Sequence, residues 1–294
     1  MSDDNLTAMI ATPTEIQYFL ELFQVRHFTR AAIRLGVTQP TLTQSILRLE
    51  EKLKCKVFHR TRQGCVPTNE GDQFYKRARE LIDAWTAVNA EVQSGNGATL
   101  QGLFRVGCHP SVGAYTIPKL IKNLYEQAPG IDIVLAHDSS RKTVEKIISF
   151  ELDMGFVINP FKHPELVLKK IGSDRVTFWK KAQAATVPEK LFADLDLMQV
   201  EALLGRGSSK ALKSWPLVQT NSLELIRTLT VSGAGVGILP ERVAKADGAR
   251  VELYDSKLPV FEDEIYVAYR RDTLKSASGK ALTRAAQIAL GVLN

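Results

Sequence analysis

Long hydrophobic runs, abundant cysteine and a basic leader are all missing from this 294-residue sequence. No apolar stretch approaches the length of a bilayer span, which excludes a membrane-spanning protein. Cys55, Cys65 and Cys108 form no CxxC pair, which excludes a disulfide-rich scaffold and favours a reducing compartment. Residues 1–15 are acidic and polar, unlike a secretory signal peptide. We therefore expect a cytoplasmic protein with no membrane partner.

Motifs for catalysis and metal binding are also missing. The five histidines share no metal-ligand spacing with the cysteines, and neither GxxxxGKS/T nor GxSxG occurs. Gly233, Gly235 and Gly237 follow a helical pattern and precede a strand, the reverse of a dinucleotide-binding turn. We expect no catalytic residue, no metal and no cofactor, and hence no enzyme. Cys108, before His109, is interpreted as a buried cysteine, with a thiol sensor as the alternative.

Positive charge, by contrast, is concentrated near the N-terminus. The chain carries a formal net charge of +6, and residues 14–65 hold nine Lys and Arg against four acids. Residues 66–98 hold three bases and five acids, so the excess belongs to one small segment. Such a cluster indicates a polyanionic partner, while a solvated basic face is the alternative interpretation.

Residues 14–68 show three helical patterns followed by two short strand-like pieces. Apolar residues recur at helical spacing in the first pattern, where Thr14 is placed as the N-cap. Thr29 and Thr38 are placed to cap the second and third helices, and Gly36 to end the second. Two short helices joined by a tight turn with a glycine predict a helix-turn-helix, and the hairpin after them predicts a wing.

One side of the third helix has the composition of a base-reading surface. Leu42, Ile46 and Leu49 are spaced to point inward, whereas Thr, Gln and Arg side chains point outward. In a major groove, Gln pairs with adenine, Arg pairs with guanine, and Thr offers a hydroxyl and a methyl. We therefore expect contacts to double-stranded DNA from Gln39, Thr41, Thr43, Gln44 and Arg48, and contacts to phosphates or the minor groove from Arg30, Arg60 and Arg62.

The helical pattern of residues 70–93 carries an apolar seam with a period of about 3.5 residues, typical of paired helices. Packing on the chain's own domain would also explain such a face, but a small-residue linker, QSGNGATLQG, follows it directly. We therefore expect this helix to join chains into a homodimer or homotetramer through Phe74, Ala78, Leu81, Trp85, Val88 and Val92.

Residues 16–71 also carry a dense set of paired motifs. They are Phe19, Phe28-Thr29, Ala31-Ala32, Gln39-Pro40, Thr43, Leu49-Glu50, the wing Val57-Phe58-His59-Arg60, and Thr68-Asn69-Glu70-Gly71. In these positions the stretch resembles the LysR-type transcriptional regulators of bacteria, although Cys55 replaces a glycine and Val57 a leucine of the family pattern. The resemblance implies that Gln39, Pro40, Thr43 and Gln44 face bases and that Arg60 or Arg62 serves the wing.

From Leu103 onward, strand-like and helix-like patterns alternate, which predicts an α/β architecture with a mostly parallel sheet. The patterns include a helix from about Pro118 to Glu126, separate strands LVLKKI and VTFWKK, and a last helix from about Ala277 to Leu290. SGAGVGILP is similar to a LysR-family segment, and the resemblance implies a two-lobed effector domain like a periplasmic binding protein. We expect an N-terminal tail at 1–13, a winged helix-turn-helix at 14–68, a linker helix at 69–97 and an effector-binding domain at 98–294, with lobe one at 101–165 and 266–294 and lobe two at 166–265.

Ligands of such sheets bind beyond the carboxyl ends of the strands, where helices begin. Free backbone N–H groups at helix starts favour an anionic small molecule. This placement predicts effector contacts from His109, Pro110, Ser111, Val112, Ser139, Ser140, Arg206, Thr220, Asn221 and Ser222. For Ser139, Asn221 and Ser222, capping of a helix is an equally good interpretation.

The sequence thus predicts a DNA-binding transcriptional regulator of LysR type that is controlled by a small molecule held between two α/β lobes. The alternative from another class is a solute-binding or enzymatic α/β protein whose N-terminal helices mediate protein contacts.

Overall fold

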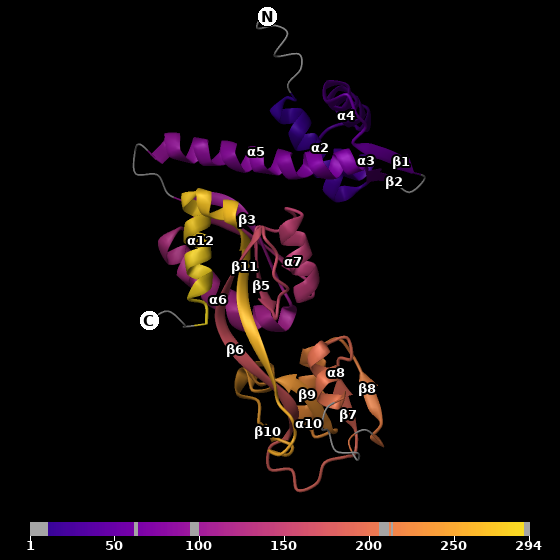
Figure 1. Cartoon of the computed structure of the whole chain (residues 1–294), viewed down its shortest axis with the longest axis vertical. Coiled ribbons are helices and arrows are strands. Elements are labelled where there is room, and N and C mark those ends of the chain that lie inside the picture. Colours follow the sequence, from indigo (N-terminus) through magenta and orange to yellow (C-terminus); the bar gives the residue numbers. More distant parts are fainter. Residues whose placement is uncertain (1–10, 62–63, 95–99, 206–211, 213, 291–294) are drawn as a thin grey trace, which may run out of the picture. The chain divides into compact units, whose positions relative to one another are not determined.

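The computed structural model describes residues 11–61, 64–94, 100–205, 212 and 214–290 (Figure 1). Its contacts divide the chain into two compact units, Met1–Ala98 and Thr99–Asn294. None of the helices in these described ranges is both long enough and apolar enough to cross a membrane.

The first unit is a winged helix-turn-helix followed by one long helix. Its elements are α2 (Pro13–Val25), α3 (Phe28–Arg34), α4 (Gln39–Leu53), β1 (Phe58–Thr61), β2 (Gly64–Pro67) and α5 (Asn69–Ser94). The two strands pair antiparallel to form the predicted wing. Gly36, with φ +68°, follows the end of α3 in the left-handed region that glycine tolerates best.

Two of the three predicted helix caps lie elsewhere. Thr12, not Thr14, caps α2, because Pro13 takes the first helical position and the Thr12 and Glu15 side chains form a capping box. His27, not Thr29, caps α3, with its Nδ1 accepting from the backbone N–H of Arg30. The prediction for α4 is confirmed, since Thr38 accepts from the backbone N–H of Thr41.

Aromatic rings form the core of the first unit. Phe19 is fully buried, and its ring lies 5.8 Å from that of Phe23, 5.3 Å from Phe58 and 4.8 Å from Phe74 between centroids. These four rings come from α2, the wing and α5. The core therefore fixes the wing and the start of α5 against the helices that carry the predicted DNA-binding surface.

The second unit is built on one mixed sheet with helices beside it. In chain order its elements are β3 (Gln101–Cys108), α6 (Pro110–Gln127), β4 (Gly130–His137), α7 (Ser140–Ile148), β5 (Met154–Ile158), β6 (Leu166–Lys181), β7 (Leu191–Ala193), α8 (Met198–Gly205), β8 (Leu217–Gln219), α10 (Leu223–Ser232), β9 (Val236–Pro240), α11 (Glu241–Ala244), η1 (Ala246–Gly248), β10 (Val251–Leu253), β11 (Phe261–Arg270), η2 (Arg271–Lys275) and α12 (Ala277–Gln287).

The sheet has the strand order β4-β3-β5-β11-β6-β9-β7-β8, with β10 paired to β6. The outer pairs β3–β4, β3–β5, β7–β8 and β7–β9 are parallel, as predicted. The expectation of a mostly parallel sheet is nevertheless wrong at the centre, where β11 and β6 run antiparallel to each other and to their other partners. These two long strands cross from one lobe to the other (Figure 1).

Three element boundaries differ from the sequence-based expectation. The helix expected from Pro118 begins at Pro110 and contains Pro118 in its interior. The separate strands LVLKKI and VTFWKK are one continuous strand, β6. The last helix ends at Gln287 rather than near Leu290. Separate buried clusters on each side of the crossing, one around Phe156 and one around Phe178, give each lobe its own core.

Candidate functional site

The outer side of α4 is open to solvent. Gln39, Thr41, Gln44 and Arg48 are exposed, and Thr43 is half-buried, whereas the opposite side of the helix is buried in the domain core. The Gln39 Oε1 atom accepts from the Thr29 hydroxyl at 3.2 Å, and this contact connects the first turns of α3 and α4. The predicted base-reading residues, Pro40 included, therefore share one accessible surface, which we call the α4 face.

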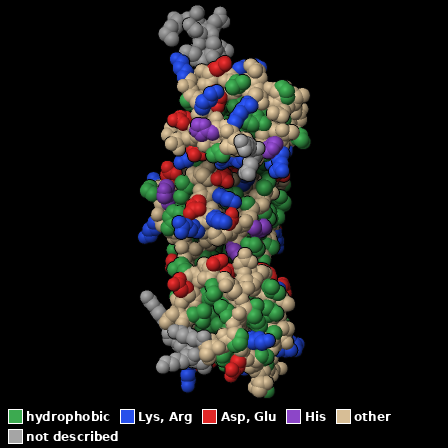
Figure 2. Space-filling view, turned by 90° about the vertical axis from the view of Figure 1, so that its right-hand side faces the viewer, with side chains coloured by type: hydrophobic (Ala, Val, Ile, Leu, Met, Phe, Trp, Pro, Cys, Tyr) green, Lys and Arg blue, Asp and Glu red, His purple; other side chains and the backbone are tan. Residues whose placement is uncertain are grey.

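Acidic side chains near the α4 face are held by bases. Glu15 pairs with Lys52 at 2.8 Å, Glu21 with Arg34 at 2.8 Å, and Glu50 with Lys56 at 2.7 Å. Burial by itself would raise the pKa of Glu15, but hydrogen bonds from Lys52 and Thr12 outweigh that effect and lower it. Glu51 is exposed near the far end of α4. Three acids of this unit are thus paired with bases, and exposed Arg and Lys side chains contribute positive charge to its surface, where some are visible in Figure 2.

The wing is fixed to the turn between α2 and α3. The backbone N–H of Cys65 donates to the carbonyl of Arg26 at 2.9 Å, and a Cβ at Gly64 would collide with that same carbonyl. The guanidinium of Arg60 lies 4.8 Å from the centroid of the Phe28 ring. These contacts hold Arg60 beside the start of α3, near the exposed Arg30. Arg62 lies outside the described residues.

The seam on α5 is partly covered by the chain itself. Phe74 packs on Phe19, and Ala78 is 2% exposed. Leu81 and Trp85, by contrast, are 55% and 61% exposed. The side chains of Val88 and Val92 lie outside those that the structure describes. A partner helix would therefore meet the seam from Leu81 onward, since the first turns are occupied by the winged helix.

The start of α6 lies at the carboxyl end of β3. His109 is the N-cap, its Nδ1 accepting from the backbone N–H of Ser111 at 3.3 Å, and Pro110 follows at the first helical position. Burial lowers the pKa of His109, although Glu224 and Asp194 of lobe two partly oppose the shift, so the imidazole is neutral at pH 7. The Ser111 hydroxyl is buried without a hydrogen-bond partner among the described residues, and Val112 is buried beside it.

The other predicted effector residues belong mainly to helix starts and turns. Ser139 caps α7 and Ser222 caps α10. Ser140 accepts from the backbone N–H of Ile158 at 2.9 Å, so its hydroxyl serves the fold. Thr220 accepts from the backbone N–H of Ser222, and Asn221 is exposed between them. Arg206 lies outside the described residues.

Cys108 has the properties of a structural cysteine. It is fully buried, and burial raises its pKa to about 11, so the reactive thiolate is scarce at neutral pH. Its sulfur lies 3.9 Å from Nδ1 of His137. No cluster of three His, Cys, Asp or Glu side chains suited to a metal ion occurs within the described ranges.

A hollow of about 440 Å³ lies beside the crossing strands, lined by Ser173, Asp174, Arg175, Glu241, Arg242, Lys245 and Glu262. None of the predicted effector residues lines it. Four of its charged side chains form two ion pairs, Lys245 with Glu241 at 2.6 Å and Arg175 with Glu262 at 3.9 Å.

Two family models match the chain over almost its whole length. Residues 13–72 match the bacterial regulatory helix-turn-helix protein model of the lysR family, and residues 97–290 match the LysR substrate binding domain. The chain belongs to the LysR family. It is a DNA-binding transcriptional regulator with an effector-binding domain, which leaves the solute-binding or enzymatic alternative without support.

The curated relatives include transcriptional regulators that align with most of this chain. The chain is similar to the HTH-type transcriptional regulator BbuR of Bordetella bronchiseptica, with 24% identity over 83% of this chain and 78% of the relative. It is 29% identical to the regulator EstR of Acinetobacter baylyi, over 79% of this chain and 81% of the relative. Among solved structures, a full-length OxyR variant from Pseudomonas aeruginosa superimposes with a TM-score of 0.69 at 22% identity, covering 96% of this chain and 95% of the other.

The sequence-based interpretation missed one polar group of this LysR-family chain. The buried carboxylate of Asp263, on β11, accepts hydrogen bonds from Asn159 and from Gln199. In the sequence, Asp263 is only one of two adjacent acids that open the strand-like run DEIYVAYR, and nothing there distinguishes it from Glu264.

Proposed function

We propose that this LysR-family regulator reads base edges in the major groove through the α4 face, with Arg30 and the wing residues Arg60 and Arg62 at the DNA backbone or minor groove. The observation that carries the proposal is the chemistry of the α4 face, whose exposed side chains are Gln, Thr and Arg, in a unit where Glu15, Glu21 and Glu50 are paired to bases. Phosphate contacts supply affinity and base contacts supply specificity in such complexes. Because the target is genomic DNA, the same proposal includes a cytoplasmic location.

Replacing Gln44 with alanine is expected to lower the preference for operator over random DNA by about tenfold, because one bidentate base contact contributes roughly 1–3 kcal/mol of discrimination. The measurement is a gel-shift titration of an operator, selected from genomic fragments retained by the protein, against a scrambled duplex at several salt concentrations. Gln24→Ala, an exposed glutamine on α2, is the matched control. An unchanged specificity ratio in Gln44→Ala would reject the base-reading role.

We further propose that a second copy of the chain covers the exposed part of the α5 seam. Leu81 and Trp85 are large apolar side chains that lie exposed on one helix, at a spacing suited to helix pairing. LysR-family regulators act as oligomers, and the proposal here is a homodimer as the unit, alone or within a homotetramer.

Trp85→Asp is expected to raise the dimer dissociation constant at least about 30-fold, because a buried interface tryptophan commonly contributes about 2 kcal/mol or more. Light scattering coupled to size-exclusion chromatography over a dilution series measures the change. Lys76→Asp places the same aspartate on an exposed position of α5 and should leave the assembly intact. Full retention of the wild-type dimer by Trp85→Asp would show that the contact lies elsewhere.

We also propose that a small effector, rather than a substrate to be converted, binds where α6, α7 and α10 begin. Support comes from the buried hydroxyl of Ser111 at the start of α6, which has no hydrogen-bond partner within the described part of the chain, and from N-terminal backbone N–H groups, which suit an anionic group. The division into a tail at 1–13, a DNA-binding domain at 14–68, a linker helix at 69–97 and an effector domain at 98–294 is consistent with two compact units that meet at residue 98.

A further inference from the structure

The carboxylate of Asp263 is held by side chains from both lobes of the effector unit. Its Oδ1 accepts from Nδ2 of Asn159 at 2.6 Å and from Nε2 of Gln199 at 2.9 Å. Its Oδ2 lies 3.1 Å from the same Gln199 nitrogen. Asp263 is 3% exposed and Gln199 is 8% exposed, so these bonds are shielded from water. We call these three residues the interlobe bridge.

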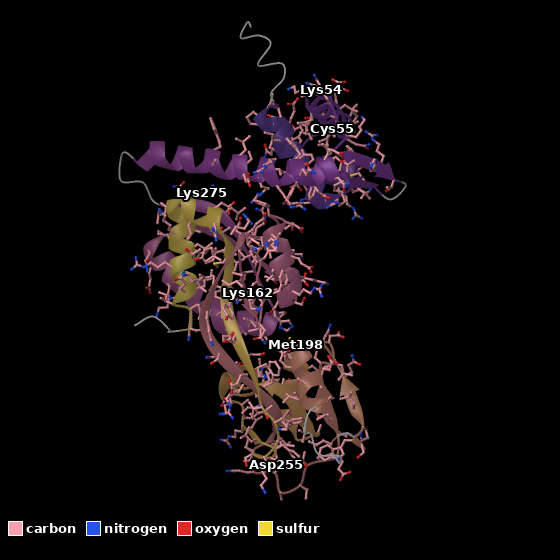
Figure 3. All side chains as sticks on the ribbon, viewed as in Figure 1. Lys54, Cys55, Lys162, Met198, Asp255 and Lys275 are labelled. Atoms are coloured by element: carbon pink, nitrogen blue, oxygen red, sulfur yellow. The ribbon has the colours of Figure 1, made fainter. Side chains whose placement is uncertain are left out.

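The two donors come from opposite lobes. Asn159 follows β5 in lobe one, where its backbone has φ +45° and its own Oδ1 accepts from the backbone N–H of Glu264 at 2.8 Å. Gln199 lies in the first turn of α8, in lobe two. The adjacent Met198 is at the end of lobe two that is next to lobe one (Figure 3). A change in the angle between the lobes would therefore separate at least one donor from Asp263.

The bridge lies beside an irregularity in the strands that connect the lobes. Along β11 and β6, Ile265 pairs with Gly172 whereas the next residue, Tyr266, pairs with Lys170, which leaves Ile171 without a partner in the register. Such a bulge locally interrupts the ladder and increases the bend of the strand. Asp263 is two residues from this point, so its hydrogen bonds lie beside an irregularity of the crossing strands.

A second buried acid faces the bridge. Asp174 on β6 is the register partner of Asp263 and is 6% exposed. Burial raises the pKa of Asp263 to about 6, and the charges of Asp174 and Glu262 add to the rise against the opposing hydrogen bonds of Gln199 and Asn159. Burial also raises the pKa of Asp174, and the backbone N–H groups of Arg175 and Arg242 partly offset that shift.

The remaining polar neighbours do not neutralise Asp263. Tyr115 on α6 has a pKa raised by burial, with Asp174 and Asp263 adding to the shift, so the phenol stays uncharged. Arg242 on α11 lies over the Tyr115 ring at 5.6 Å and donates its side chain to the carbonyl of Ser173. Arg175 is directed to Glu262 at 3.9 Å. Both amide donors of the bridge are neutral.

We propose that the interlobe bridge is a proton-dependent closure device, in which the neutral carboxyl of Asp263 favours closed lobes and the ionised carboxylate favours their separation. The proposal does not depend on the identity of the effector or on the DNA contacts. It assigns to Asp263 a positioning role, through the angle between the lobes.

The sign follows from proton linkage. When the lobes separate, water reaches Asp263 and its pKa falls from about 6 toward its ordinary value of 3.8. The closed form therefore binds the proton more tightly, and acidification stabilises it. For these two values the ratio of closed to open molecules rises about tenfold between about pH 7.5 and about pH 5.

Double electron–electron resonance, which measures the distance between two spin labels on the full-length chain, reports this ratio. Figure 3 shows Lys275 and Asp255 at opposite ends of the effector unit. Lys275→Cys in lobe one and Lys257→Cys in lobe two, two residues after Asp255, both replace exposed side chains and carry the labels. Cys55→Ser removes the half-buried native thiol, and Cys65 and Cys108 are buried. Dilution with unlabelled protein isolates distances within one chain. The wild-type distance distribution is expected to shift toward the closed form on acidification, by the tenfold ratio above.

Four variants test whether the interlobe bridge controls the closure of the lobes. Asp263→Asn is neutral and retains a carbonyl acceptor, so the lobes should be closed at both pH values. Asp263→Ala removes the acceptor of both bonds and Gln199→Ala removes one donor, so both should shift the distribution toward the open form. The glutamine variant keeps the test valid if the aspartate variant does not fold. Glu189→Gln, an exposed acid in the segment before β7, should retain the wild-type response to pH. Identical distances in wild type, Asp263→Ala and Gln199→Ala at both pH values would overturn the proposal. This holds even if the wild type is closed at both pH values, because the two variants should then still be more open than the wild type.

Discussion

Phe19→Ala is expected to lower the free energy of unfolding of the winged-helix unit by about 3–5 kcal/mol, the usual loss for a buried phenylalanine. Phe19 has no exposed surface and contacts rings from α2, the wing and α5, so the cavity would open at the point where all three meet. Because the unit is small, this loss would leave little of its stability. Chemical denaturation followed by circular dichroism measures it.

Two further variants serve as comparisons for Phe19→Ala. Gln17→Ala, on the exposed side of α2, is the matched control and should change stability by less than about 0.5 kcal/mol. Phe19→Leu fills most of the space and should fall between the two. If Phe19→Ala unfolded at the same denaturant concentration as Gln17→Ala, the aromatic cluster could not be the core of this unit.

Arg270→Met is expected to destabilise the effector unit by about 3–5 kcal/mol, because it removes a buried guanidinium and leaves Asp272, 3.2 Å away, without this ion-pair partner. Arg270 is 5% exposed, and its Nη1 donates to the carbonyls of Ile147 at 2.6 Å and Leu152 at 3.0 Å. Its guanidinium also lies 4.0 Å from the centroid of the Phe150 ring. Methionine would fill much of the volume but remove the guanidinium donor from both carbonyls, of which that of Ile147 would keep the backbone N–H of Phe150 at 3.3 Å.

Thermal unfolding of the full-length protein, monitored by calorimetry, separates this effect from that of Phe19→Ala if the two units unfold in distinct transitions. Arg271→Met, at the exposed neighbouring position, provides the control with the same chemical change. Equal shifts for Arg270→Met and Arg271→Met would mean that net charge, and not the bonds to the end of α7 and the loop after it, accounts for the result.

Local sequence patterns predicted the helices of the first unit better than their caps. The spacing of apolar residues indicated which side of α4 faces the core, and solvent exposure of Gln44 and Arg48 agrees with it. The first cap was misplaced because Pro13 can open a helix, which moves the capping role to Thr12. The second was misplaced because a histidine, a less common capping residue, precedes α3.

In the second unit, tertiary pairing overrode local patterns. Gly172 interrupts the strand-like run of residues 166–181, yet β11 pairs along both sides of it and makes one strand. Pro118 suggests a helix start, since proline tolerates the first turn, but α6 continues through it from Pro110. Neither outcome can be derived from a short window of sequence, because the deciding contacts lie far along the chain.

Side-chain groups assembled from distant segments were beyond sequence-based prediction. The Asn159–Asp263 hydrogen bond joins residues 104 positions apart, and the Gln199–Asp263 bond joins residues 64 apart. Ser140 illustrates the reverse case, because it follows a strand as a ligand-binding serine would, yet its hydroxyl accepts from Ile158. Residue type and position at a helix start could not distinguish these roles.

The unbroken course of β6 through both lobes determines how the effector unit can deform. A flexible loop between lobes would permit wide, diffuse excursions, whereas a paired strand resists them through its ladder of hydrogen bonds. Rotation of one lobe must be stored as extra twist in β6 and β11, and that twist supplies an elastic restoring torque. The angle between the lobes should therefore change only by small, reversible amounts and return to its starting value when a ligand dissociates.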